Sequence, residues 1–193
     1  MDKYLGHDAE TGGVEPSRHS LLTWYGGIYT LEADKKFLLR AELDLKLKPA
    51  NGDYLVNPGA LAVNKIDLIK HDKEAITYEE GGEKLYNFLK EHSDNGRNRL
   101  IRMGHNEPFD AQFVNAWLLR DVVWKMFTDY GGVLDSSSMA RDRKTSGKLP
   151  WNTRFKLSTL AEFLGVHADP SLLHTAKGDT HLMVRCVEKM LSM

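Results

Sequence analysis

Residues 4–13 read Tyr-Leu-Gly-His-Asp-Ala-Glu-Thr-Gly-Gly, and this stretch decides the fold. A short apolar start leads into Asp8 and Glu10, which are separated by one residue. Because side chains alternate along a β-strand, both acids point to the same face if this stretch is a strand. Two carboxylates on one face repel each other, so they belong at a solvated strand end or beside a divalent cation, which prefers oxygen ligands. The glycines at 12–13 end the strand and allow close approach to its backbone.

The composition is that of an ordinary globular domain. The 193 residues are enough for one well-cored domain, and we expect residues 1–193 to form it. Hydrophobic residues make up 41% and charged residues 27%, and the formal net charge is −1, so any basic surface must be local. A single cysteine, Cys186, excludes an internal disulfide and a cysteine-type zinc site. Its apolar neighbours predict a buried helix face.

The sequence also bears on location. No apolar run approaches 18 residues, so we expect no transmembrane span and no membrane partner. The first predicted strand begins within a few residues of Met1, which leaves no room for a signal peptide. We therefore expect a cytoplasmic protein.

The first part of the chain is rich in strand patterns. The β-forming residues of 21–30 and the alternating apolar and charged residues of 37–47 flank a turn-like segment at 32–35. With the first strand, they predict an antiparallel meander. Proline, asparagine and glycine mark 49–58 as a loop, and the residues that follow predict a short helix over 60–68.

The later part of the chain is mostly helical. Thr77 and Glu80 have the spacing of a capping box, ahead of a helix that we expect to end near Asn95–Gly96. Further patterns predict strands over 99–104 and 133–135, a helix from Pro108, and helices over 122–127, 159–164 (capped by Ser158) and 178–191. The whole predicts an α/β fold: a mixed sheet of about five strands, the first three antiparallel, flanked by helices.

One segment stands out by charge. Residues 141–156 hold six basic residues and one acid, a net charge of +5 in a chain of net −1. Glycine, proline and asparagine within it predict an exposed loop, which fits plain solvation and nucleic-acid contact equally well. Trp151 in this segment is a candidate for stacking on a single strand. Trp24, Trp117 and Trp124 lie in apolar patterns typical of a core.

Two further stretches place polar residues where predicted elements meet. Residues 104–110 read Gly-His-Asn-Glu-Pro-Phe-Asp, with Asp110 in the first turn of a helix, where the dipole favours a carboxylate. Residues 174–179 read His-Thr-Ala-Lys-Gly-Asp, with His174 in a loop and Asp179 at the start of the last helix. Taken alone, each has a structural explanation, as a helix-start acid or as a hydrogen-bonded structural histidine. The remaining histidines have no metal-ligand spacing.

In combination, the three stretches resemble the DnaQ-like 3′–5′ exonucleases of the DEDDh type, in the ribonuclease H-like superfamily. That family carries D-x-E near the N-terminus, G-H-N-x-x-F-D in the middle and H-x-A-x-x-D near the C-terminus, and this chain has all three in that order. Weaker similarities at 58–66 and 157–165 extend the resemblance over nearly the whole chain. The resemblance implies a ribonuclease H-like mixed sheet flanked by helices.

The resemblance implies a metal-dependent nuclease. Asp8, Glu10, Asp110 and Asp179 would bind two Mg²⁺ or Mn²⁺ ions, which stabilise the negative charge that develops on the attacking and leaving oxygens. His174 would be the general base toward the attacking water. The implied reaction is hydrolysis at the 3′ end of a single-stranded nucleic acid, DNA slightly favoured, with release of nucleoside 5′-monophosphates.

The resemblance also suggests substrate contacts at Thr11, Gly12, Ile66 and Asn106. The family's Asp-x-Glu-Thr-Thr-Gly lacks its second threonine here, which implies a looser fit at the terminal nucleotide. The family's His-Gly-Ile reads Asn-Lys-Ile at 64–66, so the family histidine is absent. Asn106 has a second interpretation, as the cap of the following helix.

Two other functions fit the same sequence. One is a non-cleaving module with a nuclease-like fold that binds a nucleic acid or a protein, and the other is an oligoribonuclease-type enzyme for very short RNA. The expected partners are single-stranded 3′ ends. A homodimer and a subunit of a polymerase or another complex are both compatible with the sequence.

Overall fold

A six-stranded mixed sheet organises the chain. The computed structural model describes residues 2–169, 172 and 174–193, and the side chains of all of these except 129–131. The strand order is β4-β3-β2-β1-β5-β6. The strands are β1 (Lys3–Thr11), β2 (Leu21–Leu31), β3 (Phe37–Lys48), β4 (Ile76–Thr77), β5 (Leu100–Gly104) and β6 (Thr128–Asp135). The predicted antiparallel meander of the first three strands is confirmed, and β5 and β6 extend it in parallel with β1.

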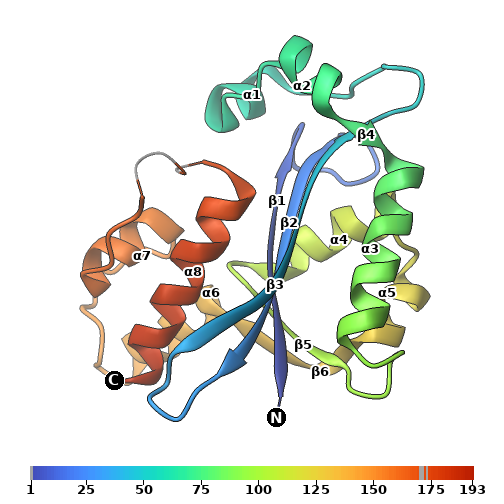
Figure 1. The fold of residues 1–193 in the computed structure, drawn as a ribbon. Coiled ribbons are helices and arrows are strands. Elements are labelled where there is room, and N and C mark those ends of the chain that lie inside the picture. The colour runs from blue at the N-terminus through green and yellow to red at the C-terminus, as the bar shows by residue number, and fades with distance from the viewer. Residues whose placement is uncertain (1, 170–171, 173) are drawn as a thin grey trace.

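Helices cover both faces of this sheet (Figure 1). One side carries α3 (Tyr78–His92), α4 (Glu107–Trp117) and α5 (Asp121–Phe127), and the other carries α6 (Ser136–Thr145), α7 (Leu157–Leu164) and α8 (Ala176–Leu191). Two short helices, α1 (Pro58–Asn64) and α2 (Leu68–Glu74), lie beyond the end of the first three strands. Within the described part of the chain, no helix combines the length and apolar character needed to cross a lipid bilayer.

Local signals explain several helix boundaries. The predicted capping box is confirmed: the Thr77 hydroxyl accepts from the backbone N–H of Glu80, whose side chain accepts from the backbone N–H of Thr77. The short helix predicted over 60–68 is present as α1, but it ends at Asn64 rather than at 68. Lys65 adopts φ 57°, a left-handed conformation that ends α1, and Asp67 then caps α2 as a separate helix.

Three other predictions of local structure are also corrected. Ser158 is not a cap, because α7 already begins at Leu157. The basic segment is not all loop, because residues 141–145 form the end of α6. β6 begins at Thr128, immediately after α5, where the sequence predicted a strand only from 133. Thr128 pairs with Leu100 and Val133 pairs with Arg102, so contacts with β5 hold the strand at both ends of a glycine-containing stretch across which the register shifts.

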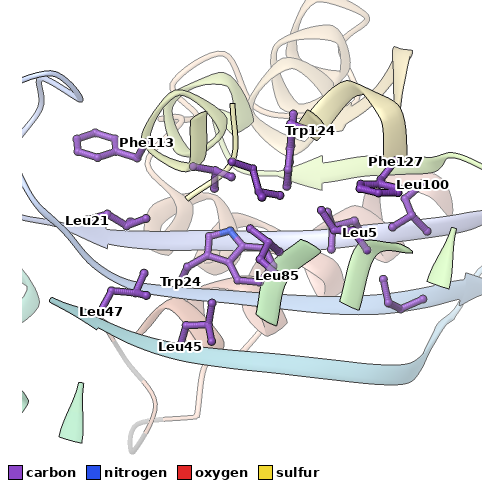
Figure 2. Close-up of a cluster of buried hydrophobic side chains, with 14 residues drawn as sticks. Leu5, Leu21, Trp24, Leu45, Leu47, Leu85, Leu100, Phe113, Trp124 and Phe127 are labelled. Atoms are coloured by element: carbon purple, nitrogen blue, oxygen red, sulfur yellow. The ribbon is translucent and has the colours of Figure 1, made fainter. Parts of the chain in front are cut away.

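The principal core lies between the sheet and α3–α5 (Figure 2). Leu5 of β1 is fully buried there with Trp24, Phe113 and Trp124. The neighbouring Tyr4 instead packs in a second cluster on the α8 side. Because side chains alternate along β1, the even-numbered residues that follow Tyr4 also face α8. This alternation places the two acids of β1 on the side of the sheet that α8 covers.

The ladder between β1 and β2 is interrupted near the site. Its register shifts between Glu10 and Thr11, so that Glu10 pairs with Thr23 and Thr11 pairs with Leu21. A bulge of this kind bends the strand and re-aims the side chains around it. The end of β1 therefore leaves the regular sheet directly after its second acid.

Replacement of Phe113 tests how much the core between the sheet and α3–α5 contributes to stability. It is completely buried, so Phe113→Ala removes a large apolar side chain and leaves a cavity, and we expect a loss of about 3–5 kcal/mol in the free energy of unfolding. Val122 is 62% exposed, so Val122→Ala should change it by less than about 0.5 kcal/mol. Urea unfolding of both variants measures this, and equal stabilities would contradict the assignment of Phe113 to the core.

Candidate active site

Three of the predicted carboxylates converge beside the centre of the sheet. Asp8 and Glu10 come from β1 and Asp179 from the first turn of α8, and one ligand oxygen of each lies within 4.8 Å of the other two. The strand alternation sends the first two acids toward α8, which packs directly on β1. A group of oxygen ligands this close fits a hard divalent cation.

The fourth predicted acid, Asp110, lies at the edge of this group. It is buried in the first turn of α4, and its carboxylate accepts a hydrogen bond from the backbone N–H of Ala9, between the two acids of β1. Asp110 does not belong to the group of described residues whose oxygens lie within 4.8 Å of one another. Its negative charge nevertheless raises the pKa of Asp8, so the four acids form one electrostatic unit.

Burial and mutual repulsion disfavour the ionised forms of these acids. Burial, followed by the charge of Asp110, holds the pKa of Asp8 well above its ordinary value. Burial and the charge of Asp179 raise the pKa of Glu10 to about 8. Burial raises the pKa of Asp179 as well, against the opposing effect of His174. A cation would relieve this repulsion, so the residues fit a bound divalent metal.

His174 lies beside the acids, as predicted from the sequence. Both its charge and a hydrogen bond from its backbone N–H act to lower the pKa of Asp179. Its φ of 60° lies in the left-handed region, which is uncommon for a residue with a side chain. The imidazole lines the same pocket as Glu10. An imidazole in this position can accept a proton from a molecule held by the carboxylates.

A polar cluster on the sheet holds the start of α8 in place. The ammonium of Lys177 lies 2.8 Å from Oε1 of Glu42 on β3, and the hydroxyl of Tyr25 donates to Oε2 of the same residue at 2.7 Å. The hydroxyl of Tyr25 also lies 3.0 Å from Nε2 of His181. These contacts tie the first turns of α8 to β2 and β3. Sequence pattern alone did not indicate this cluster, although the alternation in 37–47 places Glu42 on one face of its strand.

A second, buried cluster holds the start of α4. Oε1 of Glu107 accepts from Arg102 at 2.9 Å and lies 3.2 Å from Nε2 of His7. The backbone N–H of Glu107 donates to Oδ2 of Asp135 at 2.9 Å. These contacts orient the helix turn that carries Asp110. Neither His7 nor Glu107 has a role that the sequence predicts, although both lie within the motif stretches at 4–13 and 104–110.

Two pockets meet at Glu10 and Asn64, which line both of them. The first, the Thr11 pocket, has a volume of about 720 Å³ and lies between the end of β1, residues 13–19 and α1. The second, the Ile66 pocket, has a volume of about 560 Å³ and extends from Glu10 to α2 and the start of α8. Glu10 therefore connects the acidic group to a large concave region, which suits a binding site.

The predicted substrate residues are distributed unevenly around these pockets. Thr11 and Ile66 line the pockets named after them, and Ile66 shares its pocket with His174. Asn106 lines a different pocket, on the side of Arg102 and Asp135. Asn106 stands at the N-cap position of α4, as its alternative interpretation predicted, but its side chain makes no capping hydrogen bond.

Gly12 lines neither pocket, and its backbone is fully engaged. Its N–H donates to the carbonyl of Ser20, and its carbonyl accepts from the N–H of Asn57. A Cβ at this position would lie 2.4 Å from the carbonyl oxygen of Leu55. This close packing explains why position 12 is glycine in this chain, where the DnaQ-like exonucleases have threonine.

Asn64 occupies the position of the family histidine, and its contacts are structural. Its amide donates to the carbonyl of Thr11 at 3.2 Å, and its side-chain oxygen accepts from the N–H of Ile66 at 3.1 Å. It is buried, with only 7% of its surface exposed. Asn64 therefore fixes the end of β1 against α1 and holds Thr11 and Ile66 in position.

The sequence matches no protein-family model and no curated protein, but the fold is shared with solved nucleases. The chain superimposes on Exonuclease I from Methylocaldum szegediense with a TM-score of 0.77 at 18% identity, covering 100% of this chain and 41% of that one. The zinc-bound complex of E. coli Exonuclease I with single-stranded DNA gives 0.74 at 19% identity, covering 100% and 41%. The E. coli enzyme with a dT13 oligonucleotide gives 0.71 at 17% identity, covering 97% and 40%.

The superpositions establish the class of fold to which the chain belongs. The chain has the ribonuclease H-like fold of the exonucleases, which confirms the fold predicted from the three motifs. The particular likeness is to Exonuclease I, and this chain spans about two fifths of the length of those structures. At identities below one fifth, the likeness establishes the architecture, and the chemistry has to be argued from the site.

The raised pKa of Glu10 predicts how pH changes the stability of the metal-free protein. Glu10 has an ordinary pKa of 4.5 and about 8 in the fold, so the native state holds the proton more tightly. This contribution to stability is fully present below about pH 4.5 and is lost as the pH rises through about 8. We expect the melting temperature in EDTA to fall across this range, and Glu10→Gln to flatten the fall. A melting temperature that rises over the same range would contradict the assignment.

Metal binding should reverse this loss. Mn²⁺ at a hundred times its dissociation constant should stabilise the protein by about 2.7 kcal/mol, because the unfolded chain has no assembled site. Asp8→Asn should stabilise the metal-free protein by removing one buried charge and should weaken its response to Mn²⁺. Glu83→Gln, at an exposed acid on α3, is the matched control and should keep the full response. Differential scanning fluorimetry measures all three proteins, and identical responses would exclude a metal site at Asp8.

Proposed function

We propose that this protein is a metal-dependent 3′–5′ exonuclease that hydrolyses phosphodiester bonds at single-stranded ends. The observation that carries the proposal is the convergence of Asp8, Glu10 and Asp179 within 4.8 Å, beside His174, with Glu10 at the junction of two pockets. Acids that repel one another in a concave site are typical of centres that bind divalent cations. The polarity and the mononucleotide product come from the family resemblance.

Each residue has a distinct role in this proposal. Asp8, Glu10 and Asp179 hold the cations, and Asp110 adds negative charge at the edge of the site. Two bound Mg²⁺ or Mn²⁺ ions would supply stabilisation for the charge that develops on the attacking and leaving oxygens. His174 accepts the proton of the attacking water.

The surrounding pockets support a nucleic-acid substrate. The Thr11 and Ile66 pockets offer two compartments on either side of Glu10, which suits a chain of nucleotides better than a single small molecule. In this proposal Thr11, in the first pocket, and Ile66, in the second, contact the terminal nucleotide. The structural neighbours include E. coli Exonuclease I bound to oligonucleotides, which favours single-stranded DNA as the first substrate to test.

The proposal is tested by digestion of a 3′-labelled single-stranded oligonucleotide in Mn²⁺. We expect the wild type to release the labelled mononucleotide first, and the Asp8→Ala/Glu10→Ala double variant to release none. His174→Ala should slow the reaction by roughly 10²- to 10⁴-fold, the usual contribution of a general base. Glu83→Gln should retain the wild-type rate.

The same assay distinguishes the alternatives. A wild type that binds the oligonucleotide but cleaves no better than the double variant would identify a non-cleaving binding module. Cleavage restricted to RNA of two to five nucleotides would identify an oligoribonuclease-type enzyme. Parallel digestion of DNA and RNA, single- and double-stranded, separates these outcomes.

A further inference from the structure

A basic and aromatic surface lies outside the two pockets, on α6 and the segment after it. Nζ of Lys144 lies 5.0 Å from the ring centre of Trp151 and 5.2 Å from that of Phe155. The guanidinium of Arg141 lies 5.1 Å from the ring centre of Phe155. We call Arg141, Lys144, Trp151, Arg154 and Phe155 the Trp151 surface.

Trp151 is exposed although its segment is anchored. Its exposed fraction is 81%, the highest among the large hydrophobic residues that the structure describes. On either side of it, Leu149 is 5% exposed and Thr153 is 2% exposed, and Lys144 donates to the carbonyl of Thr153 at 3.3 Å. The fold therefore holds a large aromatic ring in solvent on a fixed support, a frequent feature of interaction sites.

The anchored segment leads to the carboxylates. Nε2 of His105, directly after β5, lies 2.7 Å from the carbonyl oxygen of Phe155. The next residue, Lys156, is close enough to Asp179 for its charge to lower the pKa of that acid. Lys156 stands five positions after Trp151, a span of at most about 18 Å of extended chain. The surface is thus continuous in sequence with Lys156, which lies close to the candidate active site.

The positive charge of the surface is largely unpaired. Arg143 pairs with Asp142 and donates to the carbonyl of Met190, so it faces the protein. Arg141 and Arg154 are exposed, and within the described part of the chain neither forms an ion pair with a carboxylate. The exposed guanidinium groups of Arg141 and Arg154 match the phosphates of a single strand, and the exposed ring of Trp151 matches its bases.

We propose that the Trp151 surface binds the strand of a single-stranded nucleic acid on the 5′ side of the end held in the active site. A base stacks on Trp151, on the side of the ring that Lys144 leaves free, and Arg141 and Arg154 contact phosphates. This inference rests on the proposed function, since it assigns the path of the substrate of that site. Acidic peptides and anionic lipid surfaces share the charge of this ligand but offer no planar ring to stack on Trp151.

The test compares a long with a short substrate in Mn²⁺. Trp151→Ala should raise KM for a 20-nucleotide dT oligonucleotide by about five- to a hundredfold, the range for loss of one base–aromatic stack, and leave kcat/KM for a dinucleotide unchanged. Trp151→Phe, which keeps a ring, should restore most of the affinity. Lys90→Ala, which removes the matched lysine over Tyr86 on α3, should change neither. Equal kinetics of Trp151→Ala and wild type on the oligonucleotide would overturn the proposal.

A binding measurement keeps the inference separate from the activity. In EDTA, fluorescence anisotropy of a labelled dT oligonucleotide should show weaker binding to Trp151→Ala than to wild type, whether or not the protein cleaves. Arg141→Ala and Arg154→Ala should each reduce the salt dependence of binding by about 0.7 in the log–log slope. If the wild type cleaves nothing but shows these differences, the proposed function fails and the binding surface stands.

The same binding assay includes the competing ligands. A labelled decapeptide of aspartate and glutamate, and phosphatidylserine vesicles, should bind Trp151→Ala and wild type equally. If Trp151→Ala loses binding to either of these ligands but not to the oligonucleotide, the surface serves a protein or membrane partner and the proposal is wrong.

Discussion

Repulsion among Asp8, Glu10 and Asp179 is the constraint on which the functional part of the structure depends. Three half-buried carboxylates whose ligand oxygens lie within 4.8 Å can coexist only if they keep protons or share a cation. Each acid is therefore carried by an element that cannot move away from the others. Two sit on β1, inside the sheet, and the third sits on α8, which packs along that strand. The stability of the fold thus opposes a local repulsion that a bound cation would remove.

Two polar clusters give the helices their fixed positions. Glu42 holds Lys177 at the start of α8, and Glu107 joins Arg102 and His7 at the start of α4. A buried ion pair such as Glu107 with Arg102 adds little net stability, because desolvation offsets the attraction between the charges. It does restrict the position of the helix turn that carries it. In both clusters the restricted turn carries an acid of the site. The two clusters therefore hold the carboxylates in position and contribute less to the free energy of unfolding.

The distribution of charge links the site to its surroundings. A chain of net charge −1 gathers acids at the end of β1 and basic residues at 141–156. Lys156 is close to the acidic centre, and the Trp151 surface continues from it. Cations neutralise the acidic centre, whereas phosphates match the basic surface. Opposite charges in adjoining regions thus favour a ligand that is itself an anionic chain.

The amino-acid sequence alone predicts the strand that carries Asp8 and Glu10, their common face, and the order of the motifs that supply Asp110, His174 and Asp179. These follow from local periodicity, helix-start chemistry and motif resemblance, which need no knowledge of distant contacts. Only the tertiary structure decided that Asp110 lies at the edge of the acidic group. It also decided that Gly12 is closed by its own hydrogen bonds and that Asn64 is a structural tie. The physical reason is that the positions of Asp110, Gly12 and Asn64 depend on contacts with residues that are distant in the chain, and on backbone distances that must be correct to about an ångström. Sequence pattern specifies neither.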